Sequence, residues 1–361
     1  MKKMLIILPG LIPAGGINVV LPLVKVLQKM QYEIEILSRE EGEMRFAFEQ
    51  LGVKVCIATD LLRNDTVDEI VEKYDEILVN TLQLFGMIYK LNGKNVHVKW
   101  WIHEPPLFFE SYRQGVPQEL WDGLAENIKV LSAGRLVHDY LQNTYQYNSE
   151  VFNFAVEDTA WTTDKCLIRK AGKVRFLLPS VMIQPIKGQD ILLMAIGMLP
   201  ENYRKRAEFV LIGTEVESSK EYYEQIKLAV DEMADVELLD RMSHKELLEQ
   251  MKVADCIVAP SREDATNACI VEGMMLSKVC ICSEKTGVSH YMEDCVSGFV
   301  FQNCNAAELR DRIMLVIDNI NRLGQVAHNG RKIYEEVFSM ESFEKRVSKI
   351  WGNLEMINKL L

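Results

Sequence analysis

The sequence predicts an α/β protein of two domains, each built on a parallel β-sheet flanked by helices. The chain has 361 residues, more than one compact core usually holds. Short apolar runs alternate with amphipathic segments through both halves, a pattern typical of βαβ units. Between Ala155 and Gly172 the pattern gives way to polar residues and a cluster of lysines and arginines. We place the junction between the two domains there.

The bulk composition narrows the class of function. A formal net charge of −11 argues against a general nucleic-acid binder, but a single nucleotide needs only a few local amides and cations. The eight cysteines show no zinc-ligand spacing and predict reduced thiols in a cytoplasmic protein. The uncharged stretch from Met4 to Val24 resembles a signal peptide or membrane span, but prolines and glycines interrupt it. We therefore expect neither an export signal nor a transmembrane helix.

In the first half, an amphipathic helix is expected at Ile17–Met30 and a second one at Glu43–Leu51. The expected strands are Met4–Leu8, Glu33–Leu37, Val53–Ile57, Glu76–Val79, Val96–Ile102 and Ile128–Leu131. Ligands of doubly wound sheets gather at the carboxyl ends of such strands.

The second half repeats the alternation and ends in an expected amphipathic helix from Ser339 to Leu361. Helices are expected at Glu221–Met233 and Cys269–Leu276, and the capping box Ser243-x-x-Glu246 opens another. The expected strands are Arg175–Leu178, Phe209–Ile212, Val236–Leu239, Cys256–Ala259, Val279–Ser283 and Gly298–Phe301.

Two turns before helices carry groups suited to an anion. The adjacent Gly15 and Gly16 let the backbone approach a ligand and leave amides at a helix N-terminus. They lack the G-x-G-x-x-G spacing of a dinucleotide site, so a plain tight turn is the alternative. Lys187 and Gly188 precede the apolar helix Ile191–Ile196, where a cation and the helix dipole both favour phosphate. The alternative for this lysine is a solvated surface side chain.

The segment from Pro260 to Glu272 places two carboxylates around a loop of small residues. Glu272 lies among apolar neighbours, so we expect it to be buried and to need a partner or a ligand. Asp264 would lie across the loop, with the amides of Thr266 to Ala268 facing the space between the acids. That order suits the sugar, diphosphate and ribose of a nucleotide sugar. The alternative is a capping Asp264 and a Glu272 paired to an unidentified base.

Together these residues resemble retaining glycosyltransferase family 4, and the match is collinear over essentially the whole chain. The Gly15-Gly16 turn resembles the family's glycine loop, Lys187 its donor-phosphate lysine, and Asp264 to Glu272 its E-x7-E motif. The resemblance implies the GT-B fold, two Rossmann-like domains with parallel sheets that face a central cleft. It implies an acceptor domain over residues 1–160, a nucleotide-sugar donor domain over 173–338, and a helix over 339–361 that crosses back to the N-terminal domain.

The resemblance also implies roles for single residues. Glu272 would bind the ribose hydroxyls, Lys187 the diphosphate and Asp264 the donor sugar. His103, after the strand Val96–Ile102, resembles a cleft histidine that contacts the sugar or the acceptor hydroxyl. The alternative is a histidine whose hydrogen bonds are satisfied at a strand end. His103, Asp264 and Lys187 are thus the expected catalytic residues.

The remaining donor contacts would come from backbone groups in two loops. The amides of Asn267 and Ala268, beside Thr266, would bind phosphate. Gly15 and Gly16 would bring the other domain to the diphosphate, with Gly16 directly under it.

The sequence departs from the family pattern at several positions. Asp264 replaces the first glutamate of the motif, and Val181-Met182 replaces a Gly-Arg pair. The missing arginine removes a bidentate phosphate clamp, for which Arg262 could compensate. His290 stands where many members have glutamate, which would reshape the donor pocket.

The predicted reaction transfers a sugar from a nucleoside-diphosphate sugar to an acceptor hydroxyl with retention, in polysaccharide, glycolipid or glycoconjugate synthesis. Helix N-termini, backbone amides and Lys187 would stabilise the leaving diphosphate, so no metal and no other cofactor is expected. No carboxylate nucleophile of the kind used by retaining hydrolases is placed for attack, which favours a front-face route.

The sequence leaves other functions open. The main alternative is a non-catalytic glycosyltransferase-like subunit that binds a sugar or nucleotide, supported by the departures at Met182 and Asp264. A sugar-nucleotide epimerase or a phosphorylase of similar fold, and a dinucleotide oxidoreductase, fit less well. The expected partners are the donor and a glycan, lipid-linked or other hydroxyl acceptor, without nucleic acid. The expected location is the cytoplasm, at the inner face of the membrane if the acceptor is lipid-linked.

Overall fold

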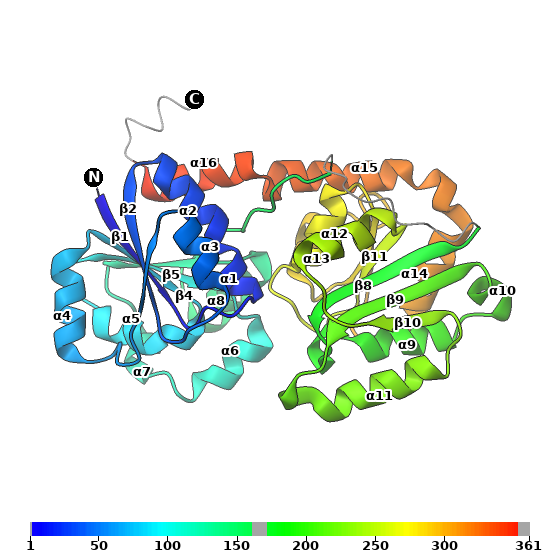
Figure 1. Cartoon of the computed structure of the whole chain (residues 1–361), viewed down its shortest axis with the longest axis horizontal. Helices are drawn as coiled ribbons and strands as arrows, with labels where there is room; N and C mark the ends of the chain where they lie inside the picture. Colours follow the sequence, from blue (N-terminus) through cyan, green and yellow to red (C-terminus); the bar gives the residue numbers. More distant parts are fainter. Residues whose placement is uncertain (1, 161–171, 353–361) are drawn as a thin grey trace. The chain divides into compact units, whose positions relative to one another are not determined.

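The structure is a computed structural model that describes residues 2–160 and 172–352, and these form two compact units. The chain passes from the first unit to the second between Ala155 and Val156, and it returns to the first unit at Met340. Each unit contains one parallel sheet accompanied by helices (Figure 1). The predicted fold class, two Rossmann-like domains and a C-terminal helix that returns to the first one, is confirmed.

The first sheet has seven strands in the order β3-β2-β1-β4-β5-β6-β7. The strands are β1 (Lys2–Leu8), β2 (Tyr32–Ser38), β3 (Lys54–Ile57), β4 (Glu76–Asn80), β5 (His97–Ile102), β6 (Ile128–Ser132) and β7 (Glu150–Val151). β1 is apolar and almost wholly buried from Met4 to Leu8, as expected of a central parallel strand. The strand order reverses between β1 and β4. That reversal is the topological switch point, beside which ligands of such sheets bind.

The helices of this unit follow the strands in alternation. They are α1 (Gly15–Asn18), α2 (Val20–Lys29), α3 (Met44–Gln50), α4 (Asn64–Lys73), η1 (Leu82–Leu84), α5 (Phe85–Leu91), α6 (Pro106–Arg113), α7 (Gln118–Asp122) and α8 (Arg135–Tyr145). The single helix expected at Ile17–Met30 is interrupted at Val19. Pro22 explains the interruption, because a proline has no N–H to bond to the carbonyl four residues earlier.

The last described helix, α16 (Met340–Trp351), belongs to the first unit and lies beside α2 (Figure 1). The ring of Phe152 lies 5.2 Å from that of Phe343 and 5.4 Å from that of Trp351, measured between centroids. The hydroxyl of Tyr32 donates to the carbonyl of Trp351 at 2.9 Å. These contacts attach the C-terminal helix to the first sheet. The remainder of the helix expected up to Leu361 lies outside the described residues.

The second sheet has six strands in the order β10-β9-β8-β11-β12-β13. The strands are β8 (Val174–Met182), β9 (Ala207–Thr214), β10 (Val236–Leu239), β11 (Cys256–Ala259), β12 (Val279–Ser283) and β13 (Phe299–Phe301). The bounds of β10, β11 and β12 are the predicted ones. Here the strand order reverses between β8 and β11, which places the switch point of this unit between the loops after those strands.

The helices of the second unit enclose an apolar core of aliphatic and phenylalanine side chains. They are η2 (Pro185–Lys187), α9 (Gln189–Gly197), α10 (Glu201–Arg204), η3 (Glu217–Ser219), α11 (Lys220–Asp231), α12 (His244–Val253), α13 (Ala268–Met275), η4 (Gly287–Tyr291), α14 (Ala306–Asn319), η5 (Ile320–Arg322), α15 (Gly324–Ile333) and the π-helix η6 (Tyr334–Phe338). The predicted capping box is present at the start of α12, with Ser243 and Glu246 bonded reciprocally.

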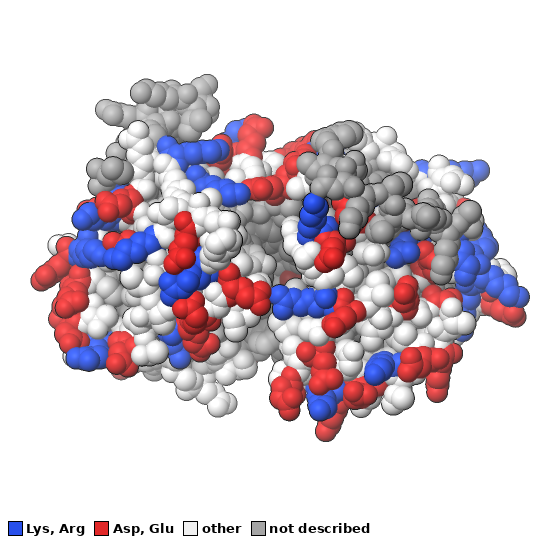
Figure 2. Space-filling model, in the orientation of Figure 1, with Lys and Arg blue, Asp and Glu red and all other residues white. Residues whose placement is uncertain are grey.

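Acidic and basic side chains are interspersed on the visible face of each unit (Figure 2). No continuous basic band of the kind that tracks a nucleic-acid backbone is seen on that face. Among the described helices, none has the length and apolar character needed to cross a membrane.

Candidate functional site

In the first unit, Gly16 lies against the loops that follow β4 and β5. A β-carbon added to Gly16 would lie 3.4 Å from Cγ2 of Thr81 and 3.5 Å from the ring of His103. The side-chain amide of Asn80 donates to the Gly16 carbonyl at 2.7 Å. Gly15 differs, because the space around its missing side chain is open. Of the two predicted glycines, therefore, only Gly16 is in close contact with the side chains of Thr81 and His103.

His103 is held as a neutral ring at the end of β5. Its Nε2 lies 2.9 Å from Oδ1 of Asn80, and its ring centroid lies 4.4 Å from that of Trp101. Burial lowers the pKa of His103 to about 3, so the imidazole is uncharged at physiological pH. Since the Asn80 amide nitrogen already donates to Gly16, its oxygen accepts from Nε2–H. Nδ1 is then the acceptor nitrogen of the ring.

A buried carboxylate fixes the loops around His103. One oxygen of Glu104 accepts the amide of Leu82 at 2.9 Å and the amide of His103 at 3.1 Å. Burial raises the pKa of Glu104, although these hydrogen bonds oppose the shift. The sequence analysis named neither Glu104 nor Asn80 as a site residue. The signal for Asn80 was present, since it ends a strand at the switch point.

In the second unit, Lys187 and Asp264 meet beside the switch point. Lys187 ends η2 after β8, and its Nζ lies 2.7 Å from Oδ2 of Asp264, which belongs to the loop after β11. Burial alone would lower the pKa of Lys187, but the charge and hydrogen bond of Asp264 outweigh it and raise that pKa. The ammonium therefore stays charged, and about a third of the lysine side chain is exposed. The two residues expected to bind the donor are thus brought together.

Gly188 permits the close approach of the two loops. Its φ is +72°, and a β-carbon there would lie 2.0 Å from the carbonyl oxygen of Pro260. Both the backbone conformation and the contact exclude a larger residue. The turn that carries Lys187 is therefore packed directly on the loop that carries Asp264.

The loop from Asp264 to Asn267 is fixed by its own hydrogen bonds. The carboxylate of Asp264 accepts the amide of Thr266 at 3.3 Å and the side-chain amide of Asn267 at 3.1 Å. Asn267 caps α13, with a φ of 74° and with Oδ1 accepting the amide of Ile270 at 3.0 Å. Ala268 is exposed and begins α13, where the first amides have no partner within the helix. Of the three expected amides, that of Thr266 is thus already committed to Asp264.

Glu272 is buried in α13, and its partner is a histidine that the sequence analysis did not identify. Oε1 of Glu272 lies 2.6 Å from Nε2 of His244, the first residue of α12. The hydrogen bond to Glu272 raises the pKa of His244, while burial opposes the shift. The His244 side chain is 66% exposed, so it can move away without opening the core. The expectation that Glu272 needs a partner or a ligand is met by a partner at the surface.

Arg262 lies in the same loop and forms a bidentate pair with Asp190. Nη1 and Nη2 lie 2.9 Å and 2.7 Å from the two carboxylate oxygens, and Nη1 also donates to the carbonyl of Pro185. These bonds tie the loop after β11 to both ends of the Lys187 turn. Use of Arg262 as a phosphate clamp would require the pair with Asp190 to open. Within residues 2–160 and 172–352, no group of three or more His, Cys, Asp or Glu side chains is arranged to hold a metal ion.

Comparison with known proteins identifies the family. Residues 168–333 match the family model of the glycosyl transferases group 1. The uncharacterized glycosyltransferase MJ1178 of Methanocaldococcus jannaschii is 28% identical over 193 residues, which cover 53% of this chain and 52% of that protein. The chain thus aligns with about half the length of that relative. The lipopolysaccharide 1,2-N-acetylglucosaminetransferase of Salmonella typhimurium is 22% identical over 309 residues, covering 79% of this chain and 75% of the relative.

Solved structures agree on the fold. HepE of Anabaena in complex with UDP-glucose superposes with a TM-score of 0.80 at 16% identity, over 97% of this chain and 99% of that chain. The predicted GT-B fold and the predicted family are both confirmed. The match places residues 168–333 in the glycosyl transferases group 1 family, the family that the sequence predicts.

Proposed function

We propose that this enzyme transfers a sugar from a UDP-sugar to a hydroxyl group of a glycan or lipid-linked acceptor, with retention at the anomeric carbon. The observation that carries the proposal is the meeting of Lys187, Asp264 and the start of α13 beside the second switch point. Crystal structures of HepE contain UDP or UDP-glucose, which supports uracil as the base of the donor nucleotide. The name of the Salmonella relative supports an acceptor in surface glycan synthesis. The cytoplasmic location, at the inner membrane face for a lipid-linked acceptor, stays a prediction.

The donor diphosphate would bind between Lys187 and the start of α13. A protonated lysine and free amides at a helix N-terminus both favour negative charge. The Lys187–Asp264 pair would then exchange partners, with the ammonium turning to phosphate and the carboxylate to a sugar hydroxyl. As diphosphate leaves, the same groups stabilise the growing negative charge.

Glu272 would accept the vicinal hydroxyls of the ribose. Its carboxyl group is buried, so a ligand that displaces His244 must replace the hydrogen bond that His244 provides. Two ribose hydroxyls can do so. His244 is therefore proposed as a positioning residue that holds the Glu272 carboxylate until the donor binds.

The first unit would supply groups for neutral hydroxyls. The acceptor nitrogen of the neutral His103 can receive a hydrogen bond from the sugar or acceptor hydroxyl, and Gly16 lets its backbone lie directly against this ring. The leaving phosphate would take the acceptor proton in a front-face reaction.

A nucleotide screen by thermal shift tests the donor site. UDP at about 100 times its dissociation constant should stabilise the folded protein by roughly 2.7 kcal/mol. Stabilisation should be lost in Glu272→Ala and kept in Glu221→Ala, a matched exposed glutamate on α11. If none of UDP, GDP, ADP, CMP and dTDP raises the melting temperature of the folded protein, the donor assignment is overturned. That result would favour the non-catalytic alternative.

A further inference from the structure

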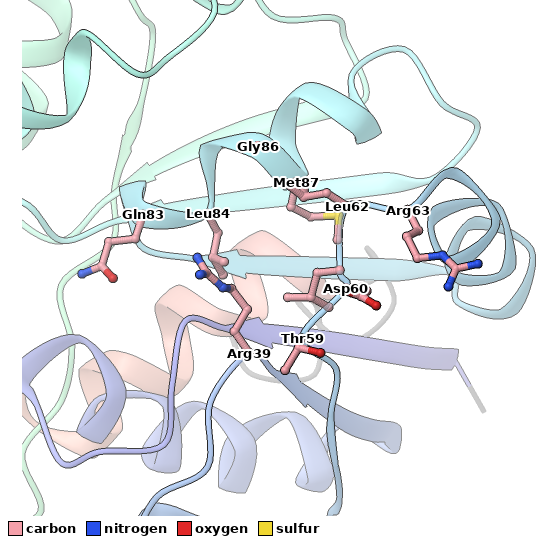
Figure 3. Close-up of a pocket in the computed structure, with 10 residues that line it drawn as sticks. Arg39, Thr59, Asp60, Leu62, Arg63, Gln83, Leu84, Gly86 and Met87 are labelled. Atoms are coloured by element: carbon pink, nitrogen blue, oxygen red, sulfur yellow. The ribbon is translucent and has the colours of Figure 1, made fainter.

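A pocket of about 460 Å³ opens in the first unit, apart from the residues described so far. That volume lies within the range of about 300–1,000 Å³ that small-molecule sites occupy. Its lining comes from the segments that follow β2, β3 and β4 (Figure 3). Because parallel strands end at one edge, the pocket shares the carboxyl edge of the sheet with Gly16 and His103. The edge that holds the hydroxyl-binding groups thus also holds a cavity.

The charge of the pocket is opposite to that of the chain. Its lining holds Arg39 and Arg63 but only one acid, Asp60, in a protein whose net charge is −11. Arg63 pairs with Asp65, with Nη2 and Oδ2 2.8 Å apart. The backbone amide of Arg39 donates to the carbonyl of Leu8. Among the described residues, its guanidinium forms no ion pair and no hydrogen bond. Arg39 is therefore a cation in a concave site that lacks a counter-ion from the described chain.

The two arginines of the lining lie apart from each other. In Figure 3 the guanidinium of Arg39 lies beside Leu84, while Arg63 lies on the far side and points away. A guanidinium binds a carboxylate or phosphate through two parallel hydrogen bonds, which makes it selective for planar or tetrahedral oxyanions.

The rest of the lining suits a sugar ring. Exposed Thr59, Asp60 and Gln83 offer hydrogen-bonding groups for hydroxyls. Leu62 is 51% exposed and packs on Gly86, where an added β-carbon would lie 3.1 Å from Leu62 Cδ1. An apolar wall next to polar groups matches the mixed surface of a pyranose.

We propose that this pocket binds the acceptor through a sugar residue that carries an acidic group, a carboxylate or a phosphate, held by Arg39. The inference rests on the proposed glycosyl transfer and narrows its acceptor to anionic glycans. Arg39 acts as a specificity residue: it selects the acceptor and takes no part in donor binding.

Matched neutral and acidic sugars test the proposal on the full-length protein. Binding of methyl β-D-glucuronide and methyl β-D-glucoside, and of glucose 6-phosphate and glucose, is measured by calorimetry and saturation-transfer NMR with UDP present. One acidic probe should bind at least tenfold more tightly than its neutral partner. Whether the glucuronide or the phosphate is preferred identifies the source of the acid. The preference should fall at high salt, because an exposed cation is screened.

Variants separate this proposal from the donor assignment. Arg39→Gln should abolish the preference, Arg39→Lys should retain part of it, and Arg322→Gln, an exposed arginine on η5, should leave it intact. UDP binding should be equal in all of these proteins. Equal affinity for acidic and neutral probes, or binding of neither, with UDP binding intact would overturn the anionic acceptor alone. If the wild-type protein does not bind UDP, the proposed function itself is overturned.

Discussion

The two switch points of this protein have the same topology but differ in the side chains that lie beside them. In the second unit the loops after β8 and β11, beside the reversal, carry the ion pair of Lys187 with Asp264, and helix α13, which follows β11, holds Glu272 against His244. In the first unit the corresponding loops hold a neutral His103 bonded to an amide, Asn80. Charged groups suit a diphosphate, and neutral ones suit hydroxyls. If the proposed function holds, the comparison teaches that the same sheet edge serves the donor or the acceptor according to the loops it carries.

The largest effect is expected from removing the cation of the charged switch point. Lys187→Ala should lower kcat/KM for the UDP-sugar by about 10²–10³, since the leaving diphosphate loses a fixed charge. Steady-state kinetics of UDP release checks this, with Lys227→Ala, an exposed lysine on α11, as the control. Nearly normal kinetics in Lys187→Ala would show that the charged pair is structural.

The next largest effect is expected from the glycine turn of the first unit. In Gly16→Ala the new methyl group would fill the space beside Thr81 and His103 in ordinary van der Waals contact, so folding should be preserved. It should nevertheless crowd the hydroxyl that binds at His103 and reduce kcat/KM by about 10–10². Gly15→Ala is the matched control, because its methyl group meets nothing within 4 Å. Equal kinetics in the two variants would contradict a role for Gly16 beside the ligand of His103.

A smaller effect, and one that depends on pH, is expected at Glu272. The folded-state pKa of His244 is raised by Glu272, so the pair stabilises the fold below the unfolded pKa of about 6.5 and loses that contribution as pH rises through the folded pKa. The same pair competes with ribose, so UDP should bind several-fold more weakly at pH 6 than at pH 8.5. Calorimetry in His244→Gln should show a flatter dependence. A wild-type affinity that rises toward low pH would have the wrong sign for this competition.

The smallest effect is expected from the neutral switch point. Because the pKa of His103 is lowered to about 3, this ring should not titrate between pH 5 and 9. His103→Gln should therefore lower kcat by a constant factor across that range. A ratio of the two rates that changes with pH near 6.5 would show that the His103 ring does ionise.

Local patterns explain why most of the fold could be predicted from the sequence. The apolar runs of β10, β11 and β12 and the capping box of α12 act over a few residues, and their bounds agree with the structure. The interruption of the first helix was also a local signal, at Pro22, but it was outweighed by the continuous apolar face.

The pairings at the candidate site were beyond sequence reasoning because they join distant segments. Lys187 and Asp264 are 77 residues apart, and His244 and Glu272 are 28 apart. The sequence indicated that a buried Glu272 needs a partner, yet periodicity does not say which of several loops supplies it. The cavity around Arg39 likewise forms only when the ends of three strands are brought to one sheet edge.

The most direct test of the contrast between the two switch points is calorimetric titration of UDP into four proteins at pH 8. We predict that the wild type and His103→Ala bind UDP with the same affinity, while Lys187→Ala and Glu272→Ala bind at least tenfold more weakly. A loss of UDP affinity in His103→Ala as large as in Lys187→Ala would contradict the assignment of the donor to Lys187 and Glu272 and of a hydroxyl to His103.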